Sequence, residues 1–138
     1  IHITQYYTLL NNIIMENNKL IAEFMNYPKC SDYWNDGRFL EEDYKDYYYV
    51  RGQYDACYNS SNFHVNDMKF GLSWDWLMPV VDKIESMGCE VVHRVGDCVV
   101  YKIDEQENYR CIIDIQGVNK LNSAYKAVVE FIKNHKIL

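Results

Sequence analysis

The side chains that could do chemistry are few in this sequence. Asp75, Asp82 and Glu85 lie within one run, and paired carboxylates can act as a general acid and base. Asp75 is equally explained as a charge at the start of a helix, and Asp82 and Glu85 as the polar face of that helix. His93 stands beside Arg94 with no partner at a catalytic spacing. We therefore predict no catalytic residues and no enzymatic activity.

Motifs for nucleophilic, phosphate or metal chemistry are also missing from the sequence. It has no GxSxG and no glycine-rich phosphate loop. Cys30, Cys57 and His64 could be considered as zinc ligands, but they lack the compact paired spacing of structural zinc sites. The five cysteines form no CxxC pair, which favours reduced thiols over a disulfide framework. We predict neither a metal nor a cofactor.

A tyrosine-rich segment, residues 29–69, is the one part with the character of a binding surface. It holds seven of the thirteen tyrosines, and seven acidic residues lie between Asp32 and Asp55. Tyrosines are enriched in interfaces and can also stack on nucleobases. The segment could pack onto the rest of the chain, bind a protein, or bind a small ligand or nucleotide. The candidate binding residues are Tyr44, Tyr47, Tyr48, Tyr49, Arg51, Tyr54, Trp76, Arg38 and Arg94.

The charge of the chain limits its partners. The net charge of −6 argues against binding duplex nucleic acid, which needs clustered lysines and arginines. A basic protein target would suit an acidic surface. No run of 18 apolar residues is present to span a membrane, and the first residues lack the pattern of a signal peptide. We expect a cytoplasmic protein.

The clearest structural element is an amphipathic helix from Ser73 to Gly88. Ser73 is suited to cap it, and Gly88 to stop it in a left-handed conformation. Pro79 lies beyond the first turn, so a bend or a tight first turn is expected. Trp74 and Trp76 point about 200° apart on a helix, so one should pack on a sheet and the other elsewhere. The apolar stripe consists of Trp74, Leu77, Val81 and Ile84.

The residues after this helix predict an antiparallel meander and a closing helix. Three runs of strand character cover residues 90–95, 98–103 and 109–115, joined by a tight hairpin and a polar loop. Helical spacing of apolar residues then covers 119–135. The prediction is an α+β fold in which a helix, a three-stranded meander and a helix form a sandwich.

Before the tyrosine-rich segment, a short helix is predicted over residues 16–25, stopped by Tyr27-Pro28. Residues 1–14 read as an N-terminal extension, either a helix or a disordered leader. The predicted organisation is this extension followed by a single α+β domain over 15–138. Within that domain, residues 29–69 would form an insertion and residues 70–138 the helix–meander–helix unit.

Three runs of the sequence resemble small proteins of bacteriophages and prophages, many of them uncharacterised. They are NKLIAEFM at 18–25, SWDWLMPVVDKIE at 73–85 and YKAVVEFIK at 125–133. Their order is similar to that of the phage ABA sandwich domain family: an "LIAE"-type helix, a tryptophan-bearing helix, a short sheet and a closing helix. The resemblance leaves out residues 1–14 and 29–69, and Asn26-Tyr27 stands where relatives tend to have Gly or Trp. It implies a phage origin and no established catalytic residues.

These observations lead to a functional hypothesis with two alternatives. The first is a non-catalytic module that binds and modulates a host or phage protein in the cytoplasm of a bacterial host. The second is a small-ligand binder, such as a sponge for a nucleotide immune signal of the host, with Arg38, Arg51 and Arg94 in recognition. An enzyme of unknown type comes third. Self-association into a homo-oligomer is compatible with each of them.

Overall fold

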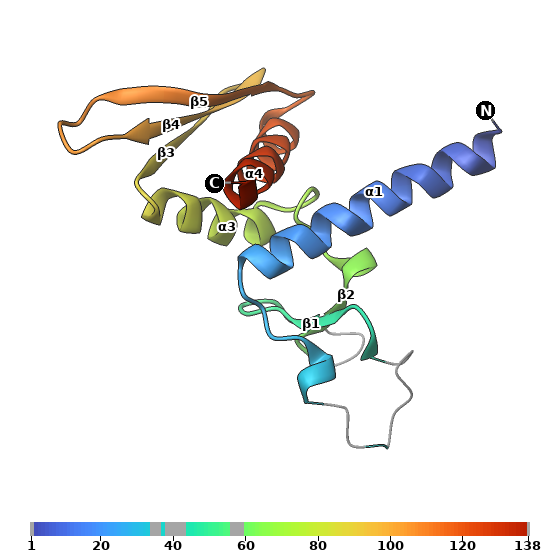
Figure 1. Ribbon diagram of the computed structural model, residues 1–138. Helices are drawn as coiled ribbons and strands as arrows, with labels where there is room; N and C mark the ends of the chain where they lie inside the picture. Colours follow the sequence, from blue (N-terminus) through green and yellow to red (C-terminus); the bar gives the residue numbers. More distant parts are fainter. Residues whose placement is uncertain (1, 34–36, 38–43, 56–59, 138) are drawn as a thin grey trace. The chain divides into compact units, whose positions relative to one another are not determined.

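The computed structural model describes residues 2–33, 37, 44–55 and 60–137, with side chains at the C-terminal end as far as His135. The chain divides into two compact units, Ile1–Met68 and Lys69–Leu138, each drawn in Figure 1. Helices and two antiparallel sheets confirm the predicted α+β class. The first unit combines the N-terminal helix with the tyrosine-rich segment, which was predicted to be an insertion into a single domain.

The first unit begins with one long helix, α1 (Ile3–Phe24). The predicted helix over 16–25 and the predicted extension over 1–14 are therefore parts of the same element. The helix ends because Asn26 adopts a left-handed conformation (φ 56°). The amide of Asn26 donates to the carbonyl of Glu23, and the amide of Tyr27 donates to that of Ala22. This is a Schellman end, so the stop lies before Tyr27-Pro28 and does not depend on the proline.

The rest of the first unit is a small hairpin with two short 3₁₀ helices. After η1 (Cys30–Asp32), strand β1 (Tyr47–Tyr49) pairs antiparallel with β2 (Asn62–His64). The chain then enters η2 (Val65–Asp67). Tyr48 lies opposite Phe63 in the register of this hairpin.

A buried asparagine connects α1 to the end of the hairpin. Asn18 is 1% exposed, and its Nδ2 donates hydrogen bonds to the carbonyls of Val65 (2.8 Å) and Met68 (3.2 Å). Buried carbonyls need such partners. One side chain therefore satisfies two backbone groups of η2 and the residue that follows it.

The second unit has the predicted order of helix, meander and helix. Its elements are α3 (Trp74–Ser86), β3 (Cys89–His93), β4 (Asp97–Ile103), β5 (Tyr109–Gln116) and α4 (Lys120–Ile137). The sheet order is β3-β4-β5, antiparallel throughout. The tight hairpin is closed by a hydrogen bond from the amide of Arg94 to the carbonyl of Asp97 (2.9 Å).

Both helices of the second unit lie against one face of the sheet (Figure 1). α3 contacts β3, α4 contacts β4 and β5, and the two helices also contact each other. The buried side chains of that face include Cys89, Val91, Val100 and Ile113. The sandwich therefore has two layers, because the helices share one side of the sheet and form a single layer.

The ends of α3 correct one prediction and confirm two others. The Ser73 side chain makes no capping hydrogen bond. Instead the Ser73 carbonyl accepts from the amides of Trp76 (3.2 Å) and Leu77 (3.1 Å), which gives the tight first turn expected ahead of Pro79. Gly88 has a φ of 85° and ends the helix as predicted.

Candidate functional site

Among the described elements, α1 carries the most exposed large apolar side chains. Large apolar side chains stand in water along its first turns, with exposed fractions from 38% to 73%. Isolated surface hydrophobes are ordinary, but a contiguous set on one element marks an interaction site. The exposed side chains are Ile3, Tyr6, Tyr7, Leu9, Leu10, Ile13 and Ile14.

Most of these side chains form a regular stripe. Ile3, Tyr7, Leu10 and Ile14 are spaced by 4, 3 and 4 residues, and the spacing continues through Asn17 to the buried Ile21 and to Phe24. A repeat of 3.5 residues is the spacing of helices that pair along a seam. Residues 1–14 were predicted only as an N-terminal extension, so this site was not among the predicted binding residues, although the spacing of its apolar residues is visible in the sequence.

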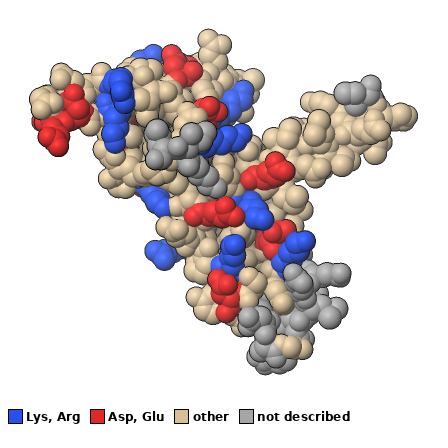
Figure 2. Space-filling model, viewed as in Figure 1, with Lys and Arg blue, Asp and Glu red and all other residues tan. Residues whose placement is uncertain are grey.

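The stripe is also free of charge. Residues 3–15 contain no Asp, Glu, Lys or Arg, and Figure 2 shows the N-terminal part of α1 without blue or red. A chain with a net charge of −6 therefore has an uncharged apolar helix face. The partner of such a face must bury apolar surface and bring few charges to it.

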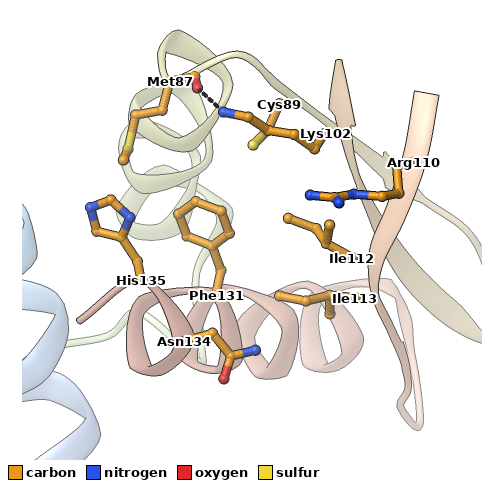
Figure 3. A pocket seen from close by; sticks show the side chains of 9 residues that line it. All are labelled: Met87, Cys89, Lys102, Arg110, Ile112, Ile113, Phe131, Asn134 and His135. Carbon is orange, nitrogen blue, oxygen red and sulfur yellow. Dashed lines mark hydrogen bonds between the residues drawn. The ribbon is translucent and has the colours of Figure 1, made fainter. Parts of the chain in front are cut away.

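A second group of side chains surrounds a cavity in the second unit (Figure 3). The cavity has a volume of about 300 Å³ and lies between the end of α3, the sheet and α4. Its floor is apolar, with Cys89, Ile113 and Phe131 all buried. Lys102 and Arg110 stand at its edge and come from neighbouring strands. None of the candidate binding residues that the structure describes lines it.

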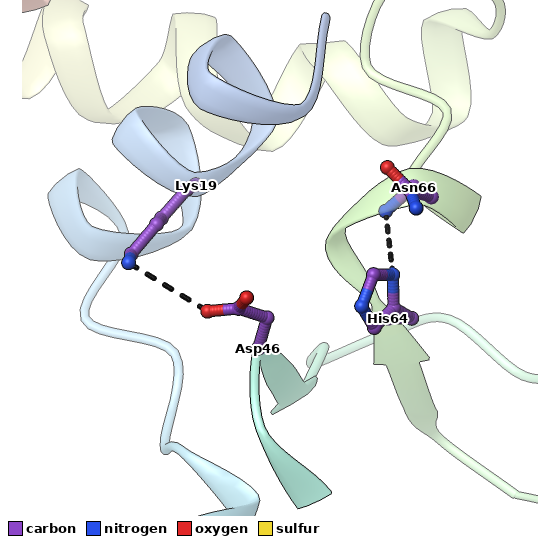
Figure 4. Close-up of polar contacts among 4 residues, drawn as sticks. All are labelled: Lys19, Asp46, His64 and Asn66. Atoms are coloured by element: carbon purple, nitrogen blue, oxygen red, sulfur yellow. Dashed lines mark hydrogen bonds and ion pairs between the residues drawn. The ribbon is translucent and has the colours of Figure 1, made fainter. Parts of the chain in front are cut away.

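The predicted tyrosines gather partly around a smaller hollow in the first unit. Tyr44 and Tyr47 line it with Lys19, Lys29 and Lys45, and its volume is about 160 Å³. The Lys19 ammonium lies 3.6 Å from the Asp46 carboxylate (Figure 4). Three lysines against one aspartate make this hollow cationic, in contrast to the acidic composition of the segment around it.

Tyr48 was predicted to lie on a binding surface, but the structure buries it. It is 2% exposed and packs in the core of the first unit. Burial, with Glu23 and Asp46 adding to it, raises the pKa of Tyr48 to about 12. Successive residues of a strand point to opposite sides, so the Tyr48 side chain lies on the opposite side of β1 from those of Tyr47 and Tyr49.

The other tyrosines and Arg51 lie nearer the surface of the first unit. The Tyr49 ring packs edge-on against Tyr33 at 5.6 Å, whereas Tyr54 is 61% exposed. Arg51 is exposed. Its positive charge acts on Tyr27: burial raises the pKa of Tyr27, and the charge of Arg51 opposes that rise. Arg38 lies outside the residues that the structure describes.

Trp76 was also predicted to be a binding residue, but it lies in the core of the second unit. It is 6% exposed and its ring packs edge-on against Phe70 at 5.3 Å. Trp74 packs against His93 of β3 at 5.2 Å, as expected for the tryptophan that meets the sheet. Arg94 lies at the hairpin turn and is engaged with Asp97 at 3.6 Å.

Among the described residues, Cys98 and His93 bring a thiol and an imidazole together as a catalytic pair would. The Cys98 Sγ lies 3.8 Å from the His93 Nδ1. A nucleophilic cysteine needs a lowered pKa and an exposed sulfur. Here the sulfur is fully buried, and burial followed by Asp97 and Asp114 raises the pKa of Cys98 to about 11. The same burial lowers the pKa of His93. This pair is therefore unsuited to nucleophilic catalysis.

In the described part of the chain, the residues suggested as zinc ligands are hydrogen-bonded or buried. His64 Nδ1 accepts a hydrogen bond from the amide of Asn66 at 3.1 Å and so caps η2 (Figure 4). Cys30 is fully buried, and Cys57 lies outside the described part of the chain. Over the described residues, no three His, Cys, Asp or Glu side chains are grouped to hold a metal ion.

Within the described ranges, no helix has both the length and the apolar character needed to cross a membrane. No family model matches the sequence, and neither a curated protein nor a solved structure does. The resemblance to small phage proteins therefore stays a prediction.

Proposed function

We propose that this protein acts by binding another polypeptide and performs no reaction of its own. The observation that carries the proposal is the exposed, uncharged stripe of α1. Burying one large apolar side chain contributes about 1.5 to 3 kcal/mol. Several such side chains on one helix face make protein binding the most favourable use of this surface.

The helix itself also requires a partner. Residues 2–14 are all exposed, and the stretch is rich in isoleucine, threonine, tyrosine and asparagine, which are modest helix formers. Helices in proteins are held mainly by packing of an apolar face, and isolated helices of this length are marginal in water. A regular helix over these residues is therefore best supported by contact with a second helix.

We infer that the second helix is α1 of another copy of this chain. A stripe without charged residues has no like-charge repulsion against itself, and the 3.5-residue spacing suits two such helices side by side. If the resemblance to small phage proteins holds, the assembled protein would act on a host or phage protein in the cytoplasm of a bacterial host.

Sedimentation velocity on charged variants of Leu10 tests this proposal. The wild-type chain should sediment as a dimer at micromolar concentration. Leu10→Lys and Leu10→Glu should each weaken self-association at least about 100-fold, because a charge in each copy would be buried in the seam. An equimolar mixture of the two variants should recover a dimer. The matched control is Asn12→Lys, an exposed position on the opposite side of α1.

Two results would contradict this assignment. One is a wild-type chain that remains monomeric at several hundred micromolar. The other is a dimer that all three variants leave unchanged, which would mean that another surface forms it. Binding of the monomer to phospholipid vesicles, lost in Leu10→Glu, would assign the stripe to a membrane surface instead.

A small-ligand function has one observation in its favour, the cationic hollow with Lys19, Lys29 and Lys45 beside Tyr44 and Tyr47. Ammonium groups and tyrosine rings suit a nucleotide or another phosphorylated molecule. Cyclic and linear nucleotides at about 100 times their Kd should stabilise the protein by about 2.7 kcal/mol in thermal unfolding. Lys45→Gln should reduce that shift, and Lys126→Gln on α4 should not. Absence of any shift at millimolar nucleotide would exclude this function.

A further inference from the structure

The cavity of the second unit has the features of a built ligand site, although none of the described candidate residues from the sequence lies in it. Its volume of about 300 Å³ is at the lower end of the range for small-molecule sites. The apolar floor is formed by side chains from three elements, β3, β5 and α4. The polar groups that line it are Lys102, Arg110, Asn134 and His135, and all four are exposed.

The two cations at this edge are placed in direct register. Lys102 of β4 and Arg110 of β5 are cross-strand partners, so their side chains leave the sheet on the same face. Like charges directly opposite each other destabilise a sheet. An anion between them would turn this repulsion into two favourable contacts, since guanidinium and ammonium groups both bind carboxylates and phosphates.

The described residues that line the cavity do not neutralise these cations. No Asp or Glu is among the described residues that line the cavity. The Lys102 Nζ donates to the carbonyl of Met87 at 3.0 Å, which holds it at the edge without cancelling its charge. Figure 3 shows the guanidinium of Arg110 beside Ile112, directed toward the cavity. In a chain with a net charge of −6, a cavity with two cations and no acid is selective for anions.

We propose that this cavity binds a small amphipathic anion. The short aliphatic or aromatic body occupies the apolar floor against Ile113 and Phe131, and the anionic head lies between Lys102 and Arg110. A carboxylate and a phosphate share the chemistry that this edge recognises. The site is separate from the α1 stripe, because every described residue that lines it belongs to the second unit.

Methyl NMR on the full chain with isoleucine labelling locates the ligand. The probes are octanoate, octyl phosphate, 1-octanol and octylammonium, each below its solubility limit. Octanoate or octyl phosphate should shift the methyl signals of Ile112 and Ile113. The exposed isoleucines of α1 report adsorption to the other apolar surface, so the two sites are distinguished in one spectrum. Whichever anion binds more tightly identifies the head group.

Calorimetry on two variants tests the role of the cations. Arg110→Gln should weaken binding of the anion about tenfold, as expected for one charge-assisted hydrogen bond, and leave octanol unaffected. Lys133→Gln, which removes an exposed charge of α4 outside the cavity, should change neither. The proposal is overturned if octanol or octylammonium binds as tightly as the anions, or if the shifts appear only at Ile3, Ile13 and Ile14.

Discussion

Asn18→Asp is expected to unfold the first unit of this protein. The carboxylate would face the carbonyls of Val65 and Met68, which now accept hydrogen bonds from the Asn18 amide. Two buried acceptors would lose their donor, and a charge would be buried beside them. Each unsatisfied buried group costs about 1 to 3 kcal/mol, so the total is about 4 kcal/mol, a large part of the stability of a small domain.

Urea denaturation followed by circular dichroism measures this loss. Asn18→Ala should lose about 3 kcal/mol, since it removes the donor without adding a charge. Asn12→Asp is the matched control, because Asn12 is exposed on the same helix; it should change stability by less than about 0.5 kcal/mol. Equal stability of Asn18→Asp and the wild type would show that α1 and η2 are not held together by this side chain.

Tyr48→Ala is expected to cost about 3 to 5 kcal/mol, the range for deleting a large aromatic side chain from a core. Tyr48 is 2% exposed and sits opposite Phe63 in the hairpin. Replacing Tyr47, Tyr48 and Tyr49 together should therefore unfold the first unit. A loss of partner binding in such a triple variant would then report unfolding and would not show that the tyrosines form a binding surface. Tyr54→Ala, at a position 61% exposed, serves as the control and should remain near wild-type stability in the same denaturation experiment.

The same tyrosine predicts a loss of stability in alkali. Its pKa is raised from 10.0 to about 12 in the folded protein, so the unfolded chain loses the phenol proton first. The contribution is fully present below pH 10 and is lost as the pH rises from about 10 to about 12. Tyr48→Phe should reduce this decline in urea midpoints measured across that range. A decline of the same size in the variant would assign it to other buried groups.

Much of the second unit was determined by its sequence. Apolar spacing, the turn residues and Gly88 predicted both helices and the three strands to within a few residues, because these signals are local. The pairing register of β4 with β5 could not be predicted from the sequence. A shift of pairing occurs between Val100 and Tyr101, and after it Lys102 faces Arg110. Only the paired strands bring these two cations together at one cavity.

The first unit shows where local signals fail. Tyr47, Tyr48 and Tyr49 are identical in type, so composition predicted one shared surface, but strand alternation and pairing with β2 put Tyr48 in the core. Trp76 was likewise a candidate binding residue, but its ring packs against Phe70. Burial depends on neighbours distant in sequence, and the residue type alone does not specify them.

The sequence by itself determined an α+β protein with an uncharged apolar N-terminal stretch. The tertiary structure decided which part of that stretch is buried and which remains exposed. Ile21 and Ala22 are fully buried, whereas the same stripe is in water from Ile3 to Ile14. A helical repeat defines a face from spacing alone, but only the three-dimensional arrangement shows whether the chain has enough apolar surface of its own to cover that face.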